Sequence, residues 1–264
     1  MICKRALELC MLPYIFFYSS WACAQPNESG FMKRTATIGA NTYCYQIFVP
    51  HDYTPKKKWP VILFLHGAGE RGDDCVTQTV VGLGPAIKRE ATSFPAIVVF
   101  PQCRRGEVWF GDMEAQALDA LEQTVKEFNG DRQRIYLTGL SMGGYGAWYL
   151  AVRHPGKFAA MAPICGGVVP PARFPFPPEA AAQIPAEKPY ETIAAQIGKT
   201  PVWIFHGEAD VVIPVTESRR MAAALEALGG NMKYTEYPGV GHNSWDKAYA
   251  EPELLKWLLA HTNK

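Results

Sequence analysis

Apolar residues in this 264-residue chain gather in short continuous runs that polar, glycine- or proline-containing segments separate. Runs rich in valine, isoleucine, leucine and phenylalanine, such as the "VILFL" that begins at Val61, are typical of strands buried on both faces of a sheet. Longer segments between them space their apolar residues three and four positions apart, which predicts amphipathic helices. We therefore expect strands over residues 59–67, 96–102, 134–140, 159–166, 201–207 and 232–239, and helices over 114–128, 142–153, 216–230 and 251–261.

The order of these elements defines the fold class. Strands alternate with helices along the chain, which predicts an α/β architecture with a mostly parallel central sheet and helices on both faces. The segment "YCYQIFVP" (43–50) alternates between apolar and polar residues and is expected to form an antiparallel edge strand, whereas residues 25–35 are interpreted as a frayed leader. In sheets of this kind, functional residues collect in the loops beyond the carboxyl ends of the strands.

The first 24 residues have the pattern of a secretory signal peptide. Lys4 and Arg5 precede an apolar run that ends in Ala22-Cys23-Ala24, so we expect cleavage after Ala24 and a single catalytic domain over residues 25–264. The run is short and contains a proline, which argues against a membrane span. A lipoprotein anchored at Cys23 is the alternative, and either reading predicts a secreted or periplasmic protein.

Charge and cysteine content narrow the functional classes. Removing residues 1–24 leaves equal numbers of acidic and basic side chains and no extended block of one sign, so nothing favours nucleic acid or an anionic membrane as partner. Four cysteines remain in the exported chain, which permits three full disulfide pairings or buried free thiols. None of them has the spacing of metal ligands. These four are Cys44, Cys75, Cys103 and Cys165.

The strongest chemical signal is Ser141, in the pentapeptide "GLSMG" between a predicted strand and a predicted helix. A strand that turns at once into a helix strains the residue at the corner and leaves no room for side chains two positions away, so glycine suits both places. This is the G-x-S-x-G nucleophile elbow. A serine hydroxyl needs a base to activate it, and the base needs a third group to orient it.

Candidates for these partners follow two later strands of the predicted sheet. Asp210 comes just after the strand at 201–207 and His242 just after the strand at 232–239, in the order serine, acid, histidine that this architecture uses. Alternative acids are Glu208 and Asp246, which also suit loop-capping roles. His66 and His206 end strands before glycine and are interpreted as hydrogen-bonded structural histidines. No cofactor is needed for this chemistry.

Two further sets of residues complete the candidate site. The glycine-rich segment "LHGAGERG" (65–72) follows a strand, so the backbone N–H groups of Ala68 and Met142 are expected to form an oxyanion hole; a plain glycine turn is the alternative. Trp109 and Trp245 follow predicted strands and are candidates for stacking on an aromatic acid or a sugar, or else for anchoring loops. The segment 166–200 begins with a proline-rich stretch and is a possible cap insertion over the site.

With these residues the chain resembles secreted bacterial serine esterases of the α/β-hydrolase superfamily. It is similar to the predicted peptidase and phospholipase/carboxylesterase-like group, related to feruloyl esterases and polyhydroxybutyrate depolymerases. The resemblance rests on "LFLHGAGERGDD", "RIYLTGLSMGGYGAW", "PVWIFHGEADVVIPV" and "YPGVGHNSWDKAY". It implies that nucleophile, acid and base are Ser141, Asp210 and His242. Dienelactone hydrolases carry cysteine at the elbow, so Ser141 is expected to set this chain apart from them.

The combined expectation is a serine carboxylesterase that hydrolyses small or polysaccharide-linked esters through an acyl-enzyme. Feruloyl and acetyl esters of plant polysaccharide are the candidate substrates. Two alternatives stay open. A serine peptidase would use the same three residues, and a non-catalytic binding protein could be built on the same fold.

Overall fold

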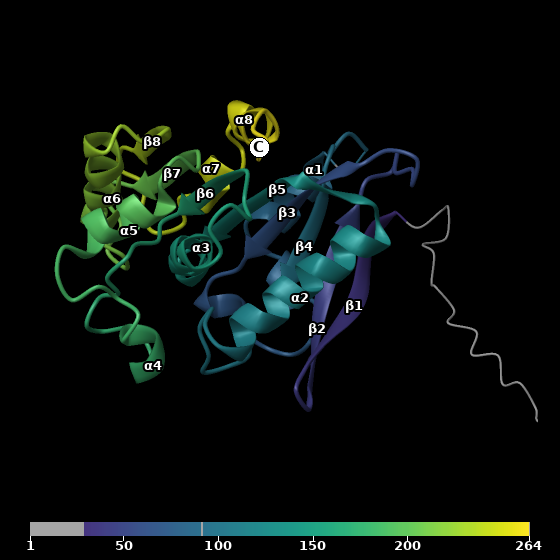
Figure 1. Ribbon diagram of the computed structural model, residues 1–264, viewed down its shortest axis with the longest axis horizontal. Helices are drawn as coiled ribbons and strands as arrows, with labels where there is room; N and C mark the ends of the chain where they lie inside the picture. Colours follow the sequence, from purple (N-terminus) through teal and green to yellow (C-terminus); the bar gives the residue numbers. More distant parts are fainter. Residues whose placement is uncertain (1–28, 91, 264) are drawn as a thin grey trace, which may run out of the picture.

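Residues 29–90 and 92–263 are described by the computed structural model, and they build an eight-stranded sheet with helices on both sides (Figure 1). The segment interpreted as a signal peptide, with Cys23, lies outside these residues. The strand order is β1-β2-β4-β3-β5-β6-β7-β8, and all neighbours from β4 through β8 are parallel. The strands are β1 (Gly30–Ile38), β2 (Asn41–Val49), β3 (Trp59–Leu65), β4 (Ile97–Pro101), β5 (Gly130–Leu140), β6 (Ala160–Ile164), β7 (Val202–Gly207) and β8 (Met232–Tyr237).

This arrangement confirms the expected α/β fold with a mostly parallel sheet, and it corrects the interpretation of the first strand. The segment 25–35 was expected to be frayed, but β1 begins at Gly30 and pairs antiparallel with β2 along its whole length. Most β1 side chains are half-exposed or exposed, so the strand lacks the apolar run that marks the others. As a result the antiparallel edge of the sheet is formed by β1, not by β2. The β2 strand lies one position further in and pairs antiparallel with β4.

The helices divide between the two faces of the sheet. On one face lie α2 (Asp112–Glu127), α3 (Met142–Arg153), α5 (Pro189–Ile197) and α6 (Thr216–Ala227); on the other lie α1 (Leu83–Arg89), α7 (Trp245–Ala248) and α8 (Pro252–Leu259). A short helix, α4 (Pro178–Ala181), lies apart from the sheet at the end of a loop (Figure 1).

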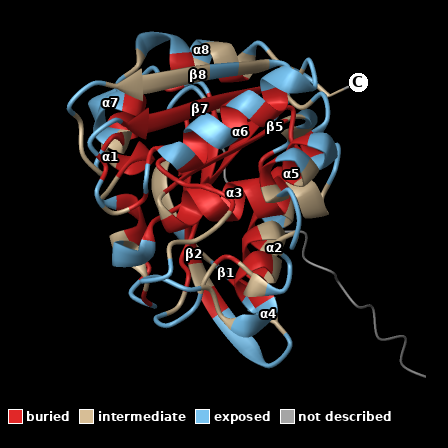
Figure 2. Cartoon of the chain, turned by 90° about the vertical axis from the view of Figure 1, so that its left-hand side faces the viewer, coloured by how far each residue is buried: buried red, intermediate tan, exposed pale blue. Residues whose placement is uncertain are grey.

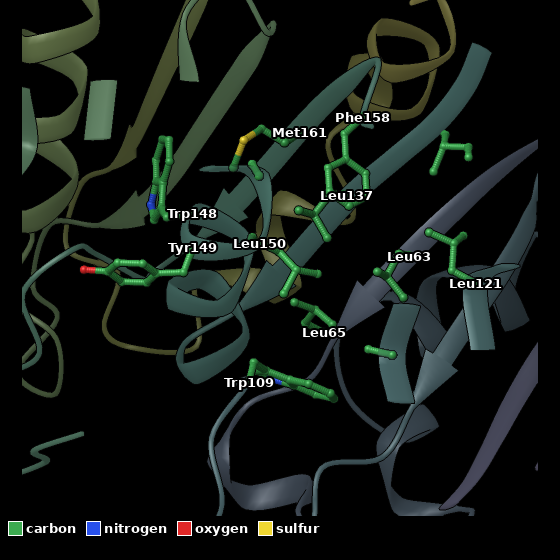
Figure 3. Close-up of a cluster of buried hydrophobic side chains, with 14 of the residues drawn as sticks. Leu63, Leu65, Trp109, Leu121, Leu137, Trp148, Tyr149, Leu150, Phe158 and Met161 are labelled. Atoms are coloured by element: carbon green, nitrogen blue, oxygen red, sulfur yellow. The ribbon is translucent and has the colours of Figure 1, made fainter. Parts of the chain in front are cut away.

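The hydrophobic core accordingly has two parts, one on each face. Successive residues of a strand point to opposite faces, and in β3 Leu63 packs under α2 and α3 while Ile62 and Phe64 pack under α1 and α8. Figure 2 shows β7 and much of α3 in the colour of buried residues, and Figure 3 shows the cluster around Leu63. Burial on both faces explains why the central strands read as unbroken apolar runs. In the described part of the chain, no helix is both long and apolar enough to cross a membrane.

Candidate active site

Ser141 occupies the sharp corner between β5 and α3. Its backbone has φ 54° and ψ −117°, a conformation that is strained for any residue with a side chain. The Ser141 N–H donates to the carbonyl of Ile164 on β6 at 2.9 Å, which holds the corner against the sheet. A Cβ on Gly139 would overlap the Gly143 carbonyl, and one on Gly143 would overlap the Leu65 carbonyl. The glycines on both sides are therefore a steric requirement of the elbow.

His242 and Asp210 join Ser141 in one hydrogen-bonded chain. The Nε2 atom of His242 lies 2.9 Å from the Ser141 hydroxyl oxygen, and its Nδ1 atom lies 2.7 Å from Oδ2 of Asp210. The serine follows β5, the acid is in the loop after β7 and the histidine in the loop after β8, so three parallel strands of one sheet bring the side chains to the same edge. The structure brings together the three residues that the sequence pattern selected.

The carboxylate of Asp210 is buried and fully hydrogen-bonded. Its Oδ1 atom accepts the backbone N–H groups of Val212 at 2.8 Å and Ile213 at 2.9 Å, while Oδ2 faces His242 and a second histidine, His206, at 3.2 Å. Burial by itself would raise the pKa of this carboxyl, but the hydrogen bonds from His206, His242 and Ile213 outweigh it and hold the pKa well below its usual range. Asp210 is therefore an anion that can orient and stabilise an imidazolium.

The two alternative acids lie elsewhere. Glu208 accepts the backbone N–H of Gly239 at 3.0 Å and so holds the turn after β8, and Asp246 is exposed on α7. His66 was expected to be structural and is: its Nε2 atom accepts the Cys103 N–H at 2.9 Å, and its Nδ1 atom lies 2.6 Å from the Gly67 carbonyl. Burial lowers the pKa of His66 to about 4, so the ring is neutral at pH 7.

The two predicted oxyanion donors both belong to the lining of the cleft. Ala68 begins a short 3-10 turn after β3 (Ala68–Glu70), and Met142 begins α3; both line the cleft that Ser141 and His242 face. The guanidinium of Arg71 donates to the Met142 sulfur from two nitrogens, at 3.2 and 3.0 Å, and links the glycine-rich loop to the elbow. Oxyanion stabilisation by the backbone of Ala68 and Met142 stays a prediction.

A cleft of about 840 Å³ opens over the serine and is mostly apolar. Its walls come from the glycine-rich loop, the elbow, the loop after β6 and the loops that carry Asp210 and His242. Tyr145 and Phe176 form one aromatic pair at its side, with ring centres 5.4 Å apart and nearly perpendicular planes. The other large side chains of the lining are Arg71, Val108, Leu140, Met142, Arg173, Phe174, Val212, Ile213 and Trp245.

The two predicted substrate-stacking tryptophans have different environments. Trp245 lines the cleft and stands edge-on to His242, with ring centres 5.4 Å apart. Trp109 is only 3% exposed, packs on His66 and donates its indole N–H to the His66 carbonyl at 3.0 Å. Figure 3 shows it within the buried cluster near Leu65. The prediction that Trp109 contacts substrate was therefore wrong. Because the ring is buried and its N–H has a partner, Trp109 anchors the loop, which was the alternative role expected for it.

The segment expected as a cap, 166–200, divides into two parts. Residues 170–177 form one wall of the cleft, whereas α5 packs against α3 and α6 and belongs to the body of the domain. The buried carboxylate of Glu217 on α6 fixes the start of the wall by accepting the N–H groups of Val168 and Val169, each at 3.0 Å. The wall is therefore shorter than the expected insertion.

Of the four cysteines, Cys44 on β2 and Cys75 in the loop after β3 form a disulfide with a Cα–Cα distance of 5.4 Å. Cys103 and Cys165 are buried free thiols, and burial raises the pKa of Cys103 to about 12. Between residues 29 and 263, leaving out residue 91, no three His, Cys, Asp or Glu side chains are grouped to hold a metal ion.

Sequence reasoning missed several residues that shape the site. Phe176 and Tyr145 line the cleft without any motif of their own, although the alternation of aromatic and proline residues in "RFPFPP" (173–178) could have marked a wall with an apolar surface. His206 was interpreted only as structural, and Glu217 was only a position in the helix expected over 216–230. Both are buried polar residues, which a single sequence does not reveal.

The fold and the arrangement of Ser141, Asp210 and His242 define a protein of the α/β-hydrolase class. More narrowly, the chain belongs to the dienelactone hydrolase family, which its sequence matches over residues 101–251. The resemblance inferred from the motifs is thus confirmed at the level of an α/β-hydrolase with esterase relatives. Ser141 was expected to set the chain apart from dienelactone hydrolases, but the match places the chain in the family named after them.

Three similar proteins carry related descriptions. A probable carboxylesterase of rice (Oryza sativa subsp. japonica) is 27% identical over 209 residues, which are 70% of this chain and 82% of the rice protein. An uncharacterized secreted protein of Arthroderma benhamiae is 28% identical over 217 residues, or 75% of this chain, but the match spans only 23% of that protein. The crystal structure of a thermostable esterase superposes with a TM-score of 0.74 at 31% identity, covering 88% of this chain and 63% of the esterase.

Proposed function

We propose that this protein is a serine carboxylesterase that works through an acyl-enzyme. The observation that carries the proposal is the hydrogen-bonded chain from Ser141 through His242 to Asp210, with 2.9 and 2.7 Å steps, at the floor of an open cleft. The esterase names of the relatives support the same reaction class.

In the proposed mechanism each residue has one role. His242 takes the Ser141 proton through Nε2 as the oxygen attacks the ester carbonyl, and then returns that proton to the leaving alcohol. Asp210 holds Nδ1–H of the imidazole and stabilises the imidazolium. The N–H groups of Met142 and Ala68 receive the developing oxyanion. A water molecule, deprotonated by His242, then attacks the acyl-enzyme and releases the acid.

The cleft supports an ester with an apolar or aromatic part. Phe176 and Trp245 are partly exposed and offer ring surfaces in the cleft, and an aromatic acyl group such as feruloyl would pack on them. The volume of the cleft, about 840 Å³, also leaves room for an alcohol part as large as a sugar. Feruloyl and acetyl esters of plant polysaccharide therefore remain the substrates that we propose to test first.

We also propose that residues 25–264 are one exported catalytic domain. The disulfide between Cys44 and Cys75 is typical of an oxidising compartment, and one relative is named a secreted protein. Sequencing the amino terminus of the mature protein tests this directly. A terminus at Gln25 supports signal cleavage after Ala24, and a blocked, lipid-bearing Cys23 supports the anchored alternative.

The function itself is tested by hydrolysis of p-nitrophenyl acetate, methyl ferulate and an acetylated sugar, each compared between the wild-type protein and Ser141→Ala. Turnover by the wild type, lost by at least about 10³-fold in the variant, is the expected result. Equal rates in both proteins would show that Ser141 is not the nucleophile.

The two alternatives give different patterns in the same panel. Cleavage of unstructured peptides without ester turnover would identify a serine peptidase. Absence of all turnover, together with ligand binding that Ser141→Ala leaves unchanged, would identify a binding protein built on this fold.

A further inference from the structure

His206 is a buried histidine that the mechanism above does not use. It lies near the end of β7, has no exposed surface, and stands opposite Glu236 of β8 in the strand register. A fully buried polar ring needs a partner for each nitrogen, and the partners of His206 lead directly to the catalytic acid.

The two nitrogens of His206 contact groups of different kinds. Nε2 lies 3.2 Å from Oδ2 of Asp210 and 3.1 Å from the carbonyl oxygen of Ile213. A carbonyl and an ionised carboxylate can only accept, so Nε2 must carry a proton and donate it to both. Nδ1 lies 2.7 Å from the hydroxyl of Ser218 on α6, which can donate to a neutral ring or accept from a charged one.

Oδ2 of Asp210 therefore receives N–H groups from two imidazoles, one on each side. His242 donates from Nδ1 and continues to Ser141; His206 donates from Nε2 and continues to Ser218. Resting on the function proposed above, we infer that His206 is a positioning residue, whose Nε2–H fixes the rotation of the Asp210 carboxylate and limits how strongly that carboxylate holds the imidazolium of His242.

The other charged groups near this pair are already engaged. Glu236 is bound by Arg219 at 2.9 Å, and Glu217, next to Ser218, accepts backbone N–H groups. The thiol of Cys165, which also lies near Asp210, is kept neutral by burial, which raises its pKa. His206 is thus the group that can change the charge balance on Asp210 without touching substrate.

The direction of the effect follows from electrostatics. The positive end of the His206 N–H dipole, or a full charge on the ring, disfavours a second positive charge on His242. Removing this donor makes Asp210 a stronger acceptor for His242, so the acidic limb of the pH–rate profile moves to higher pH. One hydrogen bond is worth about 0.3–1 pH unit. Loss of the fixed carboxylate geometry should lower kcat roughly 10- to 100-fold.

A pair of amide variants separates the donor from the bulk of the ring. In His206→Gln the amide nitrogen occupies the chain position of Nε2 and can still donate to Asp210, whereas in His206→Asn it occupies the position of Nδ1 and reaches only Ser218. We expect His206→Asn to shift the acidic limb and lower kcat with KM changed less than about twofold, and His206→Gln to restore most of both. A wild-type profile in His206→Asn, or a glutamine variant as impaired as the asparagine variant, would overturn the inference.

His66→Gln is the matched control, because His66 is equally buried and ends β3 in the same way but has no bond to Asp210. It should leave the acidic limb in place even where it lowers stability. An equal shift in this control would show that the effect is not specific to His206. Urea unfolding of each variant shows that the compared proteins are folded.

Nitrogen-15 NMR of labelled histidine gives a test that needs no turnover. The wild-type protein should show His206 protonated at Nε2, and the folded Asp210→Asn variant should show the signal of that proton displaced. Protonation at Nδ1 alone would overturn the inference, since Nε2 could not then donate. If the protein hydrolyses no ester yet shows the Nε2–H signal, the proposed function fails while the contact to Asp210 stands.

Discussion

Gly143 lies directly against the carbonyl oxygen of Leu65, with no room for a Cβ atom between them. This contact joins the first turn of α3 to the end of β3, and it brings the elbow and the glycine-rich loop to the same place. The strained corner at Ser141 therefore depends on two backbones that approach more closely than any side chain allows.

The first prediction follows from that contact. Gly143→Ala should destabilise the protein by roughly 2–3 kcal/mol, because the added methyl group must displace backbone. Turnover of p-nitrophenyl acetate should fall by about 10²-fold in the folded variant as Ser141 moves from His242. Gly241→Ala is the stability control, since a Cβ there meets no atom within 4 Å. Equal unfolding midpoints in urea for the two variants would contradict the steric explanation.

The two tryptophans of the candidate site should respond in opposite ways to truncation. Trp109→Ala removes a buried ring and should lower the free energy of unfolding by about 3–5 kcal/mol. Trp245→Ala removes a half-buried ring from the cleft wall and should raise KM for an aromatic ester roughly 2- to 10-fold, with little loss of stability. Urea unfolding measures the change in stability of each variant, and Michaelis kinetics on methyl ferulate measure the change in KM. A KM effect in folded Trp109→Ala as large as in Trp245→Ala would contradict the assignment.

His66 makes a pH-dependent contribution to stability. Burial lowers its pKa from 6.5 to about 4 in the folded protein, so the unfolded chain binds a proton at a higher pH than the folded one does. This contribution to the free energy of unfolding is complete above pH 6.5 and is lost as the pH falls from 6.5 to 4. The loss amounts to about 3 kcal/mol at pH 4. Urea unfolding at pH 7, 5.5 and 4 should show the loss in the wild type and a smaller slope in His66→Gln. The exposed His51→Gln should keep the wild-type slope; a wild-type slope in His66→Gln would reject the explanation.

The disulfide should contribute substantially to stability. Cys44 and Cys75 are separated by 31 positions, and closing a loop of that size stabilises a fold by about 3–4 kcal/mol. Replacing both by alanine should lower the free energy of unfolding by that amount and abolish the effect of dithiothreitol on the unfolding midpoint. Cys103→Ala should retain the response to dithiothreitol. If dithiothreitol left the unfolding midpoint of the wild-type protein unchanged, the disulfide would not contribute this stability.

Much of the fold and the reactive residues could be predicted from the sequence, because the signals are local. Each central strand is buried on both faces and so is apolar throughout, and Ser141 and Asp210 lie just after two such strands, β5 and β7. His242 lies in the loop after β8, a half-exposed edge strand, and was found from its place in the order serine, acid, histidine. The steric demand for glycine beside Ser141 is also local. Loops at the carboxyl ends of the strands of one parallel sheet lie at the same edge, which is why these residues could be expected to lie near one another.

The features that were missed depend on distances between segments far apart in the chain. β1 has a half-exposed, mixed pattern that resembles a loop until its pairing with β2 is known. Trp109 and Trp245 have the same local context, and only their neighbours in three dimensions separate a loop anchor from a cleft wall. The pairing of Cys44 with Cys75 likewise requires their Cα distance.

Arg173 connects the cleft wall at residues 170–177 to the loop that carries Asp210. Its guanidinium reaches from the cleft wall to the carbonyls of Val211 and Val212, and the Val212 N–H in turn holds Asp210. If residues 170–177 were replaced by the corresponding segment of a relative, the hydrogen bonds to Val211 and Val212 would be lost unless that segment also carried arginine at position 173. An exchange of residues 170–177 that is meant to change the accepted ester should therefore keep the arginine that contacts the Asp210 loop.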